Sequence, residues 1–553
     1  MSRIYSTEGL TSEELEIIEP TKIGPTWQKD AFGRWLLPEF TLGWQIAGWC
    51  SEYLQGKDGK PWKFTKEQLR FILWWYAVDR NGRFLYRKGV LQRMKGWGKD
   101  PVVAVMCLVE FVGPSRFSHF GVDGNPVGTP HPQAWVQCAA VSRDQTRNTF
   151  TLFPGLMTDH FIATYNISPG IELIRAHGGR QRLEAVTSSF RALEGGRSTF
   201  VVLNETHHWI RGNNGDKMYE TIDGNQTKGI ANRYLAITNA YVPGEDSVGE
   251  TMRMAYEKIL EGRAADIGFL YDSLEADSRV PLSGLLLPLA IARVRGDSIW
   301  LDVATIMQSI ADTSIPQSRS RRMWLNQIVA EEEALHGPET WDPLRKDDEH
   351  FTPGDEIALG FDGGKTDDAT ALVAIRVRDG FVDPIGIWEK PDGPQGDGWE
   401  IDKEKVDWAV RDTFRVYTVV GFYADVALWE SHISDWAEDF GEELIAKAPG
   451  RNAVAWDMRS SLQRSTRAHE RLMQAIFDRK LSHNGDRTLR RHVLNARRRN
   501  NNYGVSFGKE SKGSPKKVDA YAALMLAHEA MTDYRTGVKK VKKPHGSRGW
   551  FLG

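Results

Sequence analysis

One stretch near residue 100 joins a short apolar run, a loop with two glycines and a lysine, and a second apolar segment. The run 89–92 predicts a buried strand, and the segment 102–111 predicts a helix. The loop between them contains Gly96, Gly98 and Lys99. A strand, such a loop and a helix N-terminus cradle phosphate, because backbone N–H groups and the helix dipole attract an anion and the lysine reaches the outer phosphates. We therefore expect an α/β domain with a phosphate-binding loop.

This loop departs from the usual phosphate-loop pattern at two positions. Arg93 stands where a first glycine is usual, and Asp100 stands where serine or threonine is usual. The alternative interpretation is an ordinary glycine-rich turn before a helix, with Asp100 as N-cap and Pro101 at the first helical position. The segments around the loop favour the phosphate-binding interpretation.

Further apolar runs at 134–141, 200–203 and 234–238 alternate with helical segments, which is typical of a parallel sheet. The second run leads into Asn204 and Glu205. A carboxylate at such a strand end can orient an attacking water beside the phosphate loop. The third run ends at Thr238 and Asn239, where a polar side chain could sense a γ-phosphate.

The segment 64–78 has apolar residues at helical spacing, with Thr65 as a candidate N-cap. Gln68 lies in this helix, ahead of the phosphate loop. In motor ATPases a glutamine there can read an adenine edge. The alternative is an exposed polar residue of the helix.

The composition restricts the class of protein. A chain of 553 residues is too long for one core, so two or three domains are expected. The formal charge of −2 gives no global attraction to nucleic acid, so any such surface must be local. Three dispersed cysteines argue against a disulfide framework or a cysteine-bound zinc. No apolar run is long enough to span a bilayer and no signal peptide is evident, which predicts a cytosolic protein.

We expect five consecutive regions. They are an irregular lead-in (1–60), a P-loop core (61–245), a helical lid or linker subdomain (246–350), a second α/β domain (351–535) and a basic tail (536–553).

In the second α/β domain, carboxylates stand at the ends of predicted elements. The strand 357–361, with 369–377 as its hairpin partner, ends in Asp362; the strand 419–424 ends in Asp425; and Asp519 opens a helix. Each alone is typical of a cap or turn. Together they can converge at one edge of a sheet, where hard oxygen ligands bind Mg²⁺ or Mn²⁺ and a pair of ions drives phosphodiester hydrolysis. Asp367 or Asp368 could add a fourth ligand.

A basic stretch precedes Asp519. Residues 487–517 contain ten Lys and Arg against one acidic residue, Glu510. A charge run is usually a solvated face, but beside a metal site it suits a track for a phosphate backbone without base reading.

The ordered set of motifs resembles one family, the large terminase subunit of tailed bacteriophages, over about residues 60–535. The resemblance rests on the glutamine, the deviant phosphate loop, the acidic strand end, the Thr-Asn pair and the segments LSHNGDRTLRRHVLNARRRNNNYG and KKVDAYAALMLAHEA. It implies an α/β protein with an N-terminal P-loop (ASCE/RecA-like) ATPase domain and a C-terminal RNase H-like nuclease domain.

The resemblance also implies roles for single residues. Arg93, Gly96, Gly98 and Lys99 would bind ATP, with Gln68 at the adenine. Glu205 would be the catalytic glutamate, and Thr238-Asn239 would couple hydrolysis to movement. Asp362, Asp425 and Asp519 would be the catalytic, metal-binding carboxylates of the nuclease. A neighbouring subunit would supply a trans-acting arginine, for which Arg191 and Arg197 are candidates.

The implied function is a viral DNA-packaging motor. ATP hydrolysis would drive double-stranded DNA into a procapsid, and the nuclease would cut concatemeric DNA. The implied partners are a portal protein, a small terminase subunit and further copies of the chain in a ring, expected to be a pentamer. The protein would act in the host cytoplasm, transiently on the procapsid, and be absent from the mature virion.

Two departures from the family fall at the metal of the ATPase. We hypothesise that Asp100 carries the negative charge for Mg²⁺ and that Asn204 hydrogen-bonds a metal-bound water, since an unmetallated Asp100 would repel triphosphate. The rival is a crippled or slow ATPase. Two other functions stay open, an ATP-dependent helicase or nuclease of repair and a catalytically decayed DNA-binding assembly protein.

Overall fold

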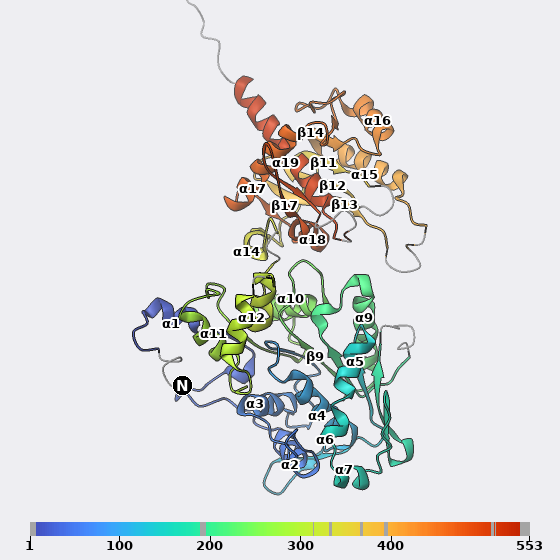
Figure 1. Cartoon of the computed structure of the whole chain (residues 1–553). Coiled ribbons are helices and arrows are strands. Elements are labelled where there is room, and N and C mark those ends of the chain that lie inside the picture. Colours follow the sequence, from blue (N-terminus) through green and yellow to red (C-terminus); the bar gives the residue numbers. More distant parts are fainter. Residues whose placement is uncertain are drawn as a thin grey trace, which may run out of the picture. The chain divides into compact units, whose positions relative to one another are not determined.

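The computed structural model describes residues 7–187, 195–312, 314–330, 334–364, 369–391, 396, 398–509, 514 and 516–541. The chain is divided into two compact units (Figure 1). The first comprises Met1–Val242 with Asp246–Glu332, and the second comprises Pro243–Glu245 with Glu333–Gly553. Each unit contains its own large sheet.

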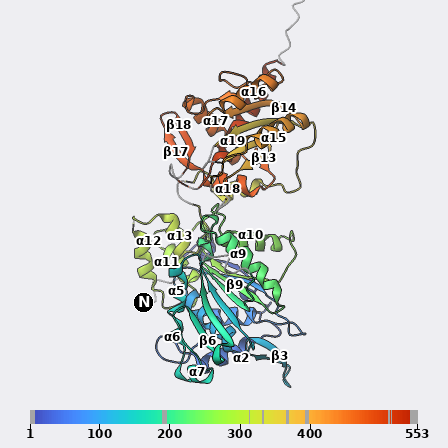
Figure 2. The same ribbon diagram turned by 90° about the vertical axis from the view of Figure 1, so that its right-hand side faces the viewer.

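The first unit is built on an eight-stranded sheet (Figure 2). Its strands, in spatial order, are β1 (Thr21–Ile23), β10 (Phe269–Glu275), β2 (Lys88–Gln92), β9 (Arg233–Thr238), β8 (Phe200–Asn204), β5 (Trp135–Ala139), β7 (Gln181–Val186) and β6 (Leu173–Ala176). The strands from β10 to β7 are parallel, and β1 and β6 are antiparallel at the edges. The predicted strands β2, β5, β8 and β9 are all present. Because β9 lies between β2 and β8, the order is that of the predicted ASCE/RecA-like class.

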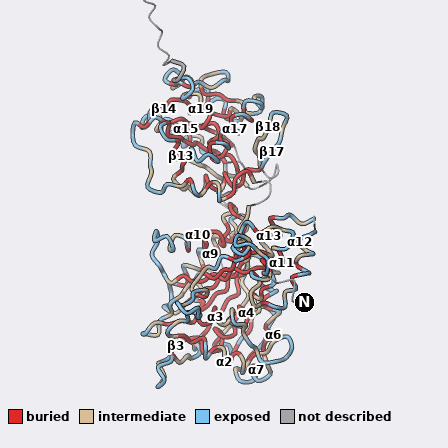
Figure 3. Tube along the Cα trace, turned by 90° about the vertical axis from the view of Figure 1, so that its left-hand side faces the viewer, coloured by how far each residue is buried: buried red, intermediate tan, exposed pale blue. Residues whose placement is uncertain are grey.

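Helices cover both faces of this sheet. Alternate side chains of each strand point to opposite faces. Leu91 and Val202 join one core with α2 (Gly43–Tyr53), α3 (Lys66–Trp75) and α4 (Lys99–Val112). Val90 and Val201 join the other core with α9 (Gly215–Asn225) and α10 (Val248–Leu260). The central strands are therefore buried on both sides, as Figure 3 shows.

The remaining elements of the first unit are shorter. They are α1 (Ser12–Ile18), β3 (Arg116–Phe120), β4 (Pro126–Thr129), α5 (Arg143–Phe150), α6 (Phe153–Leu156), α7 (Asp159–Thr164), α11 (Leu286–Val294), α12 (Val303–Ala311) and α13 (Gln317–Trp324).

Two expectations about this unit were wrong. Residues 1–60 are not an irregular lead-in, because β1 pairs with β10 and α2 buries Ile46, Trp49 and Cys50 at helical spacing. Residues 246–350 are not a separate lid or linker subdomain, because β10 joins the main sheet beside β2 and the residues from Glu333 on belong to the second unit.

The second unit has a six-stranded sheet. Its strands, in spatial order, are β15 (Ala455–Trp456), β14 (Thr418–Asp425), β11 (Glu356–Asp362), β12 (Thr370–Arg376), β13 (Phe381–Trp388) and β16 (Ser482–His483). β11, β12 and β13 form an antiparallel meander, as the predicted hairpin requires, and β14 is parallel to β11. Three antiparallel strands followed by parallel strands beside the first are the order of the predicted RNase H-like class.

Helices again cover both faces of this sheet. One core contains α15 (Lys403–Val416) and α16 (Glu430–Phe440), and the other contains α17 (Leu462–Phe477), α18 (Arg487–Asn495) and α19 (Asp519–Val541). α19 lies directly on β11, since a Cβ built on Gly360 would be 1.9 Å from the Ala523 carbonyl oxygen. The unit also contains the short α14 (Pro338–Trp341) and a hairpin of β17 (Arg497–Asn501) and β18 (Gly504–Gly508). In the part of the chain that is described, no helix has the length and apolar character to cross a membrane.

Candidate active sites

The predicted phosphate loop connects β2 to α4. Gly96 has φ 79° and Gly98 has φ 105°, which are left-handed values that glycine adopts without strain. Gly98 precedes the helix and Lys99 is its first residue, so Asp100 lies within the first turn and is not the N-cap. The backbone therefore has the turn and helix start that a phosphate cradle requires.

Lys99 is buried and directed at the strand beside the loop. Its Nζ donates to the carbonyls of Arg93 at 3.1 Å and Met94 at 3.3 Å, and to Oδ1 of Asn239 at 2.6 Å. Burial lowers the pKa of Lys99, while the carboxylates of Glu205 and Asp100 raise it. The ammonium is thus held in place by the loop and by the residue that follows β9.

Glu205 and Asn239 lie together because of the sheet register. Asn204, the last residue of β8, pairs with Ile237 of β9, so the residues that follow both strands come to the same edge. Asn239 Nδ2 donates to Glu205 Oε2 at 3.4 Å. Asn239 therefore links Lys99 to Glu205.

The backbone of Glu205 is unusual. Its φ of 56° and ψ of 53° are left-handed values that a residue with a side chain rarely adopts. Such conformations persist where the surrounding structure enforces them and are concentrated at functional sites. Burial raises the pKa of Glu205, whereas Lys99 lowers it.

Thr238 is fully buried at the end of β9. Its hydroxyl donates to the Asn239 carbonyl at 2.8 Å and accepts from the His207 backbone N–H at 3.1 Å. Thr238 Oγ1 also lies 3.1 Å from His207 Nδ1. The Thr-Asn pair is thereby tied to the turn that carries Glu205.

Arg93 has an internal partner. It forms an ion pair with Asp272 of β10, and both side chains are almost fully buried. The guanidinium also lies 5.0 Å from the ring of Trp27 and 5.1 Å from that of Trp97. These contacts direct Arg93 into the core beside β2.

Asp100 and Asn204 differ in their surroundings. Asp100 is half-buried and interacts electrostatically with Lys99 and Glu205. Asn204 faces α5, because its Nδ2 donates to Thr149 Oγ1 at 2.9 Å and to the Gln145 carbonyl at 3.5 Å. The Asn204 amide nitrogen is thus directed at α5, whereas Asp100 lies near the lysine and the glutamate.

Gln68 lies beside the phosphate loop. Its backbone and side chain form a capping box with Thr65 at the start of α3. A Cβ built on Gly98 would be 3.4 Å from Gln68 Nε2 and 3.2 Å from the ring of Trp300. Trp300 donates from Nε1 to the Gly96 carbonyl at 2.9 Å, and half of its surface is exposed. An amide and an indole thus both lie close to Gly98.

Of the two arginine candidates, Arg197 belongs to the described residues. Arg197 is exposed in the segment before β8. Arg191 lies outside the described residues, as do Asp367 and Asp368.

The three predicted nuclease carboxylates come to one edge of the second sheet. Phe361 pairs with Ala424, so Asp362 and Asp425 end neighbouring parallel strands. α19 runs back along β11, with Ala523 against Gly360, which places its first residue, Asp519, at the same end. The oxygens of these three carboxylates do not all lie within 4.8 Å of one another. Among the described residues, the acidic and histidine side chains that do so are those of Glu205, His207 and His208.

Asp425 is almost fully buried. Burial and the nearby carboxylate of Asp457 raise the pKa of Asp425. The hydrogen bond that Asp425 accepts from the Met458 backbone N–H, at 3.1 Å, lowers it. A buried carboxylate beside another acid is stabilised by a cation. Asp425 therefore has the burial and the acidic neighbour that favour a nearby cation.

The basic stretch is only partly available to a ligand. Arg490 pairs with Asp342 at 2.7 Å, Arg491 pairs with Glu389, and Arg497 is buried. Arg487 and Arg498 are exposed. A phosphate track along α18 and the hairpin would use these exposed members.

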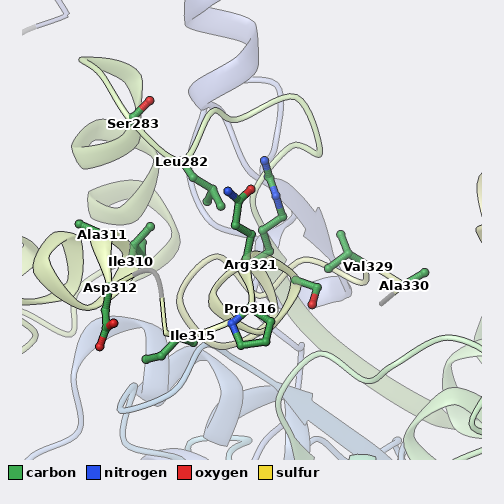
Figure 4. A pocket seen from close by; sticks show the side chains of 12 residues that line it. Leu282, Ser283, Ile310, Ala311, Asp312, Ile315, Pro316, Arg321, Val329 and Ala330 are labelled. Carbon is green, nitrogen blue, oxygen red and sulfur yellow. The ribbon is translucent and has the colours of Figure 1, made fainter. Parts of the chain in front are cut away.

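A pocket of about 940 Å³ lies elsewhere in the first unit, between α12 and α13 (Figure 4). Leu282, Ile310 and Ile315 line it, and Arg321 is anchored to the Val280 carbonyl at 3.0 Å. It contains none of the predicted site residues.

Sequence reasoning missed the two histidines after Glu205. Among the described residues, Glu205, His207 and His208 form the one group of at least three His, Cys, Asp or Glu side chains whose ligand atoms lie within 4.8 Å of one another. Burial lowers the pKa of His207 well below its ordinary value, and neighbouring His208 lowers it further. The available signal was the adjacent His-His pair two residues after a strand-end glutamate.

Comparisons with known proteins complete this description. No protein-family model matches the chain. The gene 13 protein of Mycobacterium phage L5 is 41% identical over 575 residues, covering 94% of this chain and 96% of that protein. The gene 13 protein of Mycobacterium phage D29 is 38% identical over 577 residues, with the same coverage. The crystal structure of the HK97 bacteriophage large terminase aligns with 89% of this chain and 100% of its own, at 16% identity and a TM-score of 0.49. The identity to both gene 13 proteins over nearly their whole length shows that this chain belongs to the mycobacteriophage gene 13 protein family.

Proposed function

We propose that the chain is the large terminase subunit of a tailed bacteriophage, a motor and nuclease that packages double-stranded DNA. The observation that carries the proposal is the presence of two chemically distinct sites in one chain. The first joins a phosphate-loop lysine to a strand-end glutamate through Asn239. The second would be formed by Asp362 and Asp425, which end neighbouring parallel strands of a separate sheet, and by Asp519, which begins the helix packed on that sheet.

The first site suits ATP hydrolysis. The loop from Gly96 to Lys99 would bind the outer phosphates, and Gln68 would contact the adenine. Lys99 would stabilise the charge that develops on the γ-phosphate, and Glu205 would orient the attacking water. Thr238 is hydrogen-bonded to the turn that carries Glu205, and Asn239 is hydrogen-bonded to Lys99 and Glu205. The two residues would therefore couple ATP hydrolysis to movement of β9. Mg²⁺, when bound, neutralises phosphate charge, and Asp100 would hold it.

The second site suits phosphodiester hydrolysis. Asp362, Asp425 and Asp519 would hold divalent ions, Mg²⁺ or Mn²⁺, which supply an activated water and stabilise the leaving oxygen. Exposed Arg487 and Arg498 would contact the phosphate backbone without reading sequence. The nuclease would cut concatemeric DNA at the start and end of packaging.

The finer features of this function follow from the resemblance. The subunits would form a ring, expected to be a pentamer, on the portal of a procapsid. A small terminase subunit would recognise the DNA, and Arg191 or Arg197 would act in trans on a neighbouring ATP. The protein would work in the host cytoplasm.

The test separates the two sites in the full chain. Glu205→Gln should abolish Mg²⁺-dependent ATP hydrolysis and keep plasmid cleavage with Mn²⁺, and Asp362→Asn should do the reverse. Glu220→Gln, on the exposed side of α9, is the matched control for both assays. ATP hydrolysis that survives Glu205→Gln, or cleavage that survives Asp362→Asn, would refute the assignment.

The role of Asp100 needs its own variants. If Asp100 holds the metal, Asp100→Ala should lose ATP hydrolysis, while Asp100→Ser, which restores the usual hydroxyl, should retain a measurable rate. Unchanged activity in Asp100→Ala would eliminate this role.

A further inference from the structure

The orientation of His207 is determined by its neighbours. Thr238 has one hydroxyl proton, and it is donated to the Asn239 carbonyl at 2.8 Å. The contact of 3.1 Å between Thr238 Oγ1 and His207 Nδ1 therefore needs its proton from the histidine. A neutral His207 with its proton on Nδ1 has a lone pair on Nε2.

That lone pair faces a carboxylate. His207 Nε2 lies 3.2 Å from Glu205 Oε2. Two acceptors at this separation repel unless a proton or a cation lies between them. A metal ion bound between Nε2 and Oε2 would accept a lone pair from each of them.

A third ligand is within reach. His208 is exposed, its ring centroid lies 4.0 Å from that of His207, and one of its nitrogens is within 4.8 Å of the ligand atoms of Glu205 and His207. In a tetrahedral site with metal–nitrogen bonds of roughly 2.0–2.1 Å, neighbouring ligand atoms are about 3.3 Å apart. The Nε2–Oε2 separation of 3.2 Å already matches this value, and the exposed His208 offers the third ligand atom.

The site also has its supporting residues. Metal-bound histidines usually donate their other ring N–H to an oxygen, which fixes the ring and the tautomer. Thr238 Oγ1 is such an oxygen for His207. The turn itself is anchored by buried Trp209, whose Nε1 donates to the Asn204 carbonyl at 2.8 Å.

We propose that Glu205, His207 and His208 bind a divalent transition-metal ion such as Zn²⁺, and that the bound ion blocks ATP hydrolysis by occupying Glu205. Two imidazoles and one carboxylate favour zinc, nickel or cobalt, whereas Mg²⁺ prefers oxygen ligands. Binding of the metal needs only the geometry of this turn, while the blocking of hydrolysis rests on the proposed function.

The binding test uses the full chain with Asp362→Asn, so that the predicted nuclease site contributes little. Zn²⁺ is titrated calorimetrically in excess Mg²⁺, without nucleotide. One Zn²⁺ should bind per chain, and adding His208→Gln should weaken it at least tenfold. His119→Gln, an exposed histidine on β3, is the matched control and should leave binding unchanged. No uptake, or uptake that His208→Gln leaves intact, overturns the proposal.

A second measurement needs no substitution in the turn. Diethyl pyrocarbonate modifies accessible imidazole nitrogens, and mass spectrometry locates the product. Zn²⁺ should protect His208 and leave His119 reactive; equal reactivity of His208 with and without Zn²⁺ contradicts the site.

The effect on hydrolysis is measured as the rate with Zn²⁺ divided by the rate of the same variant without it. This ratio should fall with Zn²⁺ in the parent and stay near one with His208→Gln. An active ATPase that Zn²⁺ does not inhibit would overturn the blocking role and leave the proposed function standing. A chain that binds Zn²⁺ without hydrolysing ATP would refute the proposed function and the blocking role but leave the metal site.

Discussion

The Nζ of Lys99 lies 2.6 Å from Oδ1 of Asn239, and the amide nitrogen of the same Asn239 points at Glu205. One side chain therefore positions both the cation and the carboxylate of the proposed ATPase site. We expect Asn239→Ala to lower the kcat of ATP hydrolysis by on the order of 10²-fold, with a smaller change in KM, because the groups that act in the transition state lose their alignment. Steady-state kinetics check this, with Asn125→Ala in an exposed turn as control. A raised KM with unchanged kcat would mean that Asn239 serves only in binding.

Trp300 should report nucleotide binding. Its indole contacts both glycines of the phosphate loop and is half exposed, so a nucleotide there changes its surroundings. We expect ATP to change the tryptophan fluorescence of the chain and Trp300→Phe to remove most of that change. Trp408→Phe, an exposed tryptophan of α15, should preserve it. A signal that survives Trp300→Phe would place the nucleotide elsewhere.

Arg93 should matter more for stability than for ATP affinity. Arg93→Ala leaves Asp272 buried without its partner, which costs about 3–5 kcal/mol of unfolding free energy. Asp272→Ala should cost a similar amount, and the double variant should cost less than the sum. Urea denaturation measures all three. If Arg93→Ala instead keeps its stability and raises the KM for ATP, the arginine binds the nucleotide in the complex.

Glu389 should govern part of the acid unfolding of the second unit. Burial raises its pKa, but hydrogen bonds and charge from His492 and Arg491 outweigh this and lower it to about 2. A carboxyl whose folded pKa is depressed stabilises the fold above its unfolded pKa, and this contribution is lost as the pH falls from about 5 to 2. Glu389→Gln should cost on the order of 2 kcal/mol at pH 7 and flatten the stability profile in that window.

Thermal unfolding at several pH values tests this expectation. Glu438→Gln, at an exposed position of α16, is the control and should keep the slope of the parent. The same slope in Glu389→Gln would show that other carboxyls cause the acid unfolding.

Sequence reasoning succeeded where local signals are strong. β2, the glycine turn and α4 are adjacent in the chain, and β8 and β9 are continuous apolar runs with polar residues at their ends. The positions of Asp362 and Asp425 at strand ends were predicted because each ends such a run. The parallel register that brings these strand ends side by side was seen only in the structure.

Other features depend on partners distant in sequence. β10 contains the charged residues Asp272 and Glu275, so it does not have the apolar pattern of a buried strand. In the structure these carboxylates form ion pairs with Arg93 and Arg253. The direction of the Asn204 amide is decided by Thr149 on α5. The pairing of His207 with Glu205 depends on the left-handed turn at Glu205, which no local pattern indicated.

The absence of a side chain at Gly360 lets the main chain of α19 touch β11, so the spacing between Asp362 and Asp519 is set by backbone against backbone. Even one methyl group there would collide with the Ala523 carbonyl and lift the helix. Gly360→Ala should therefore impair DNA cleavage from a position that never meets the substrate, while Gly537→Ala, in open space on the same helix, should be tolerated. The edge that carries the three predicted nuclease carboxylates is thus positioned by a residue that has no side chain.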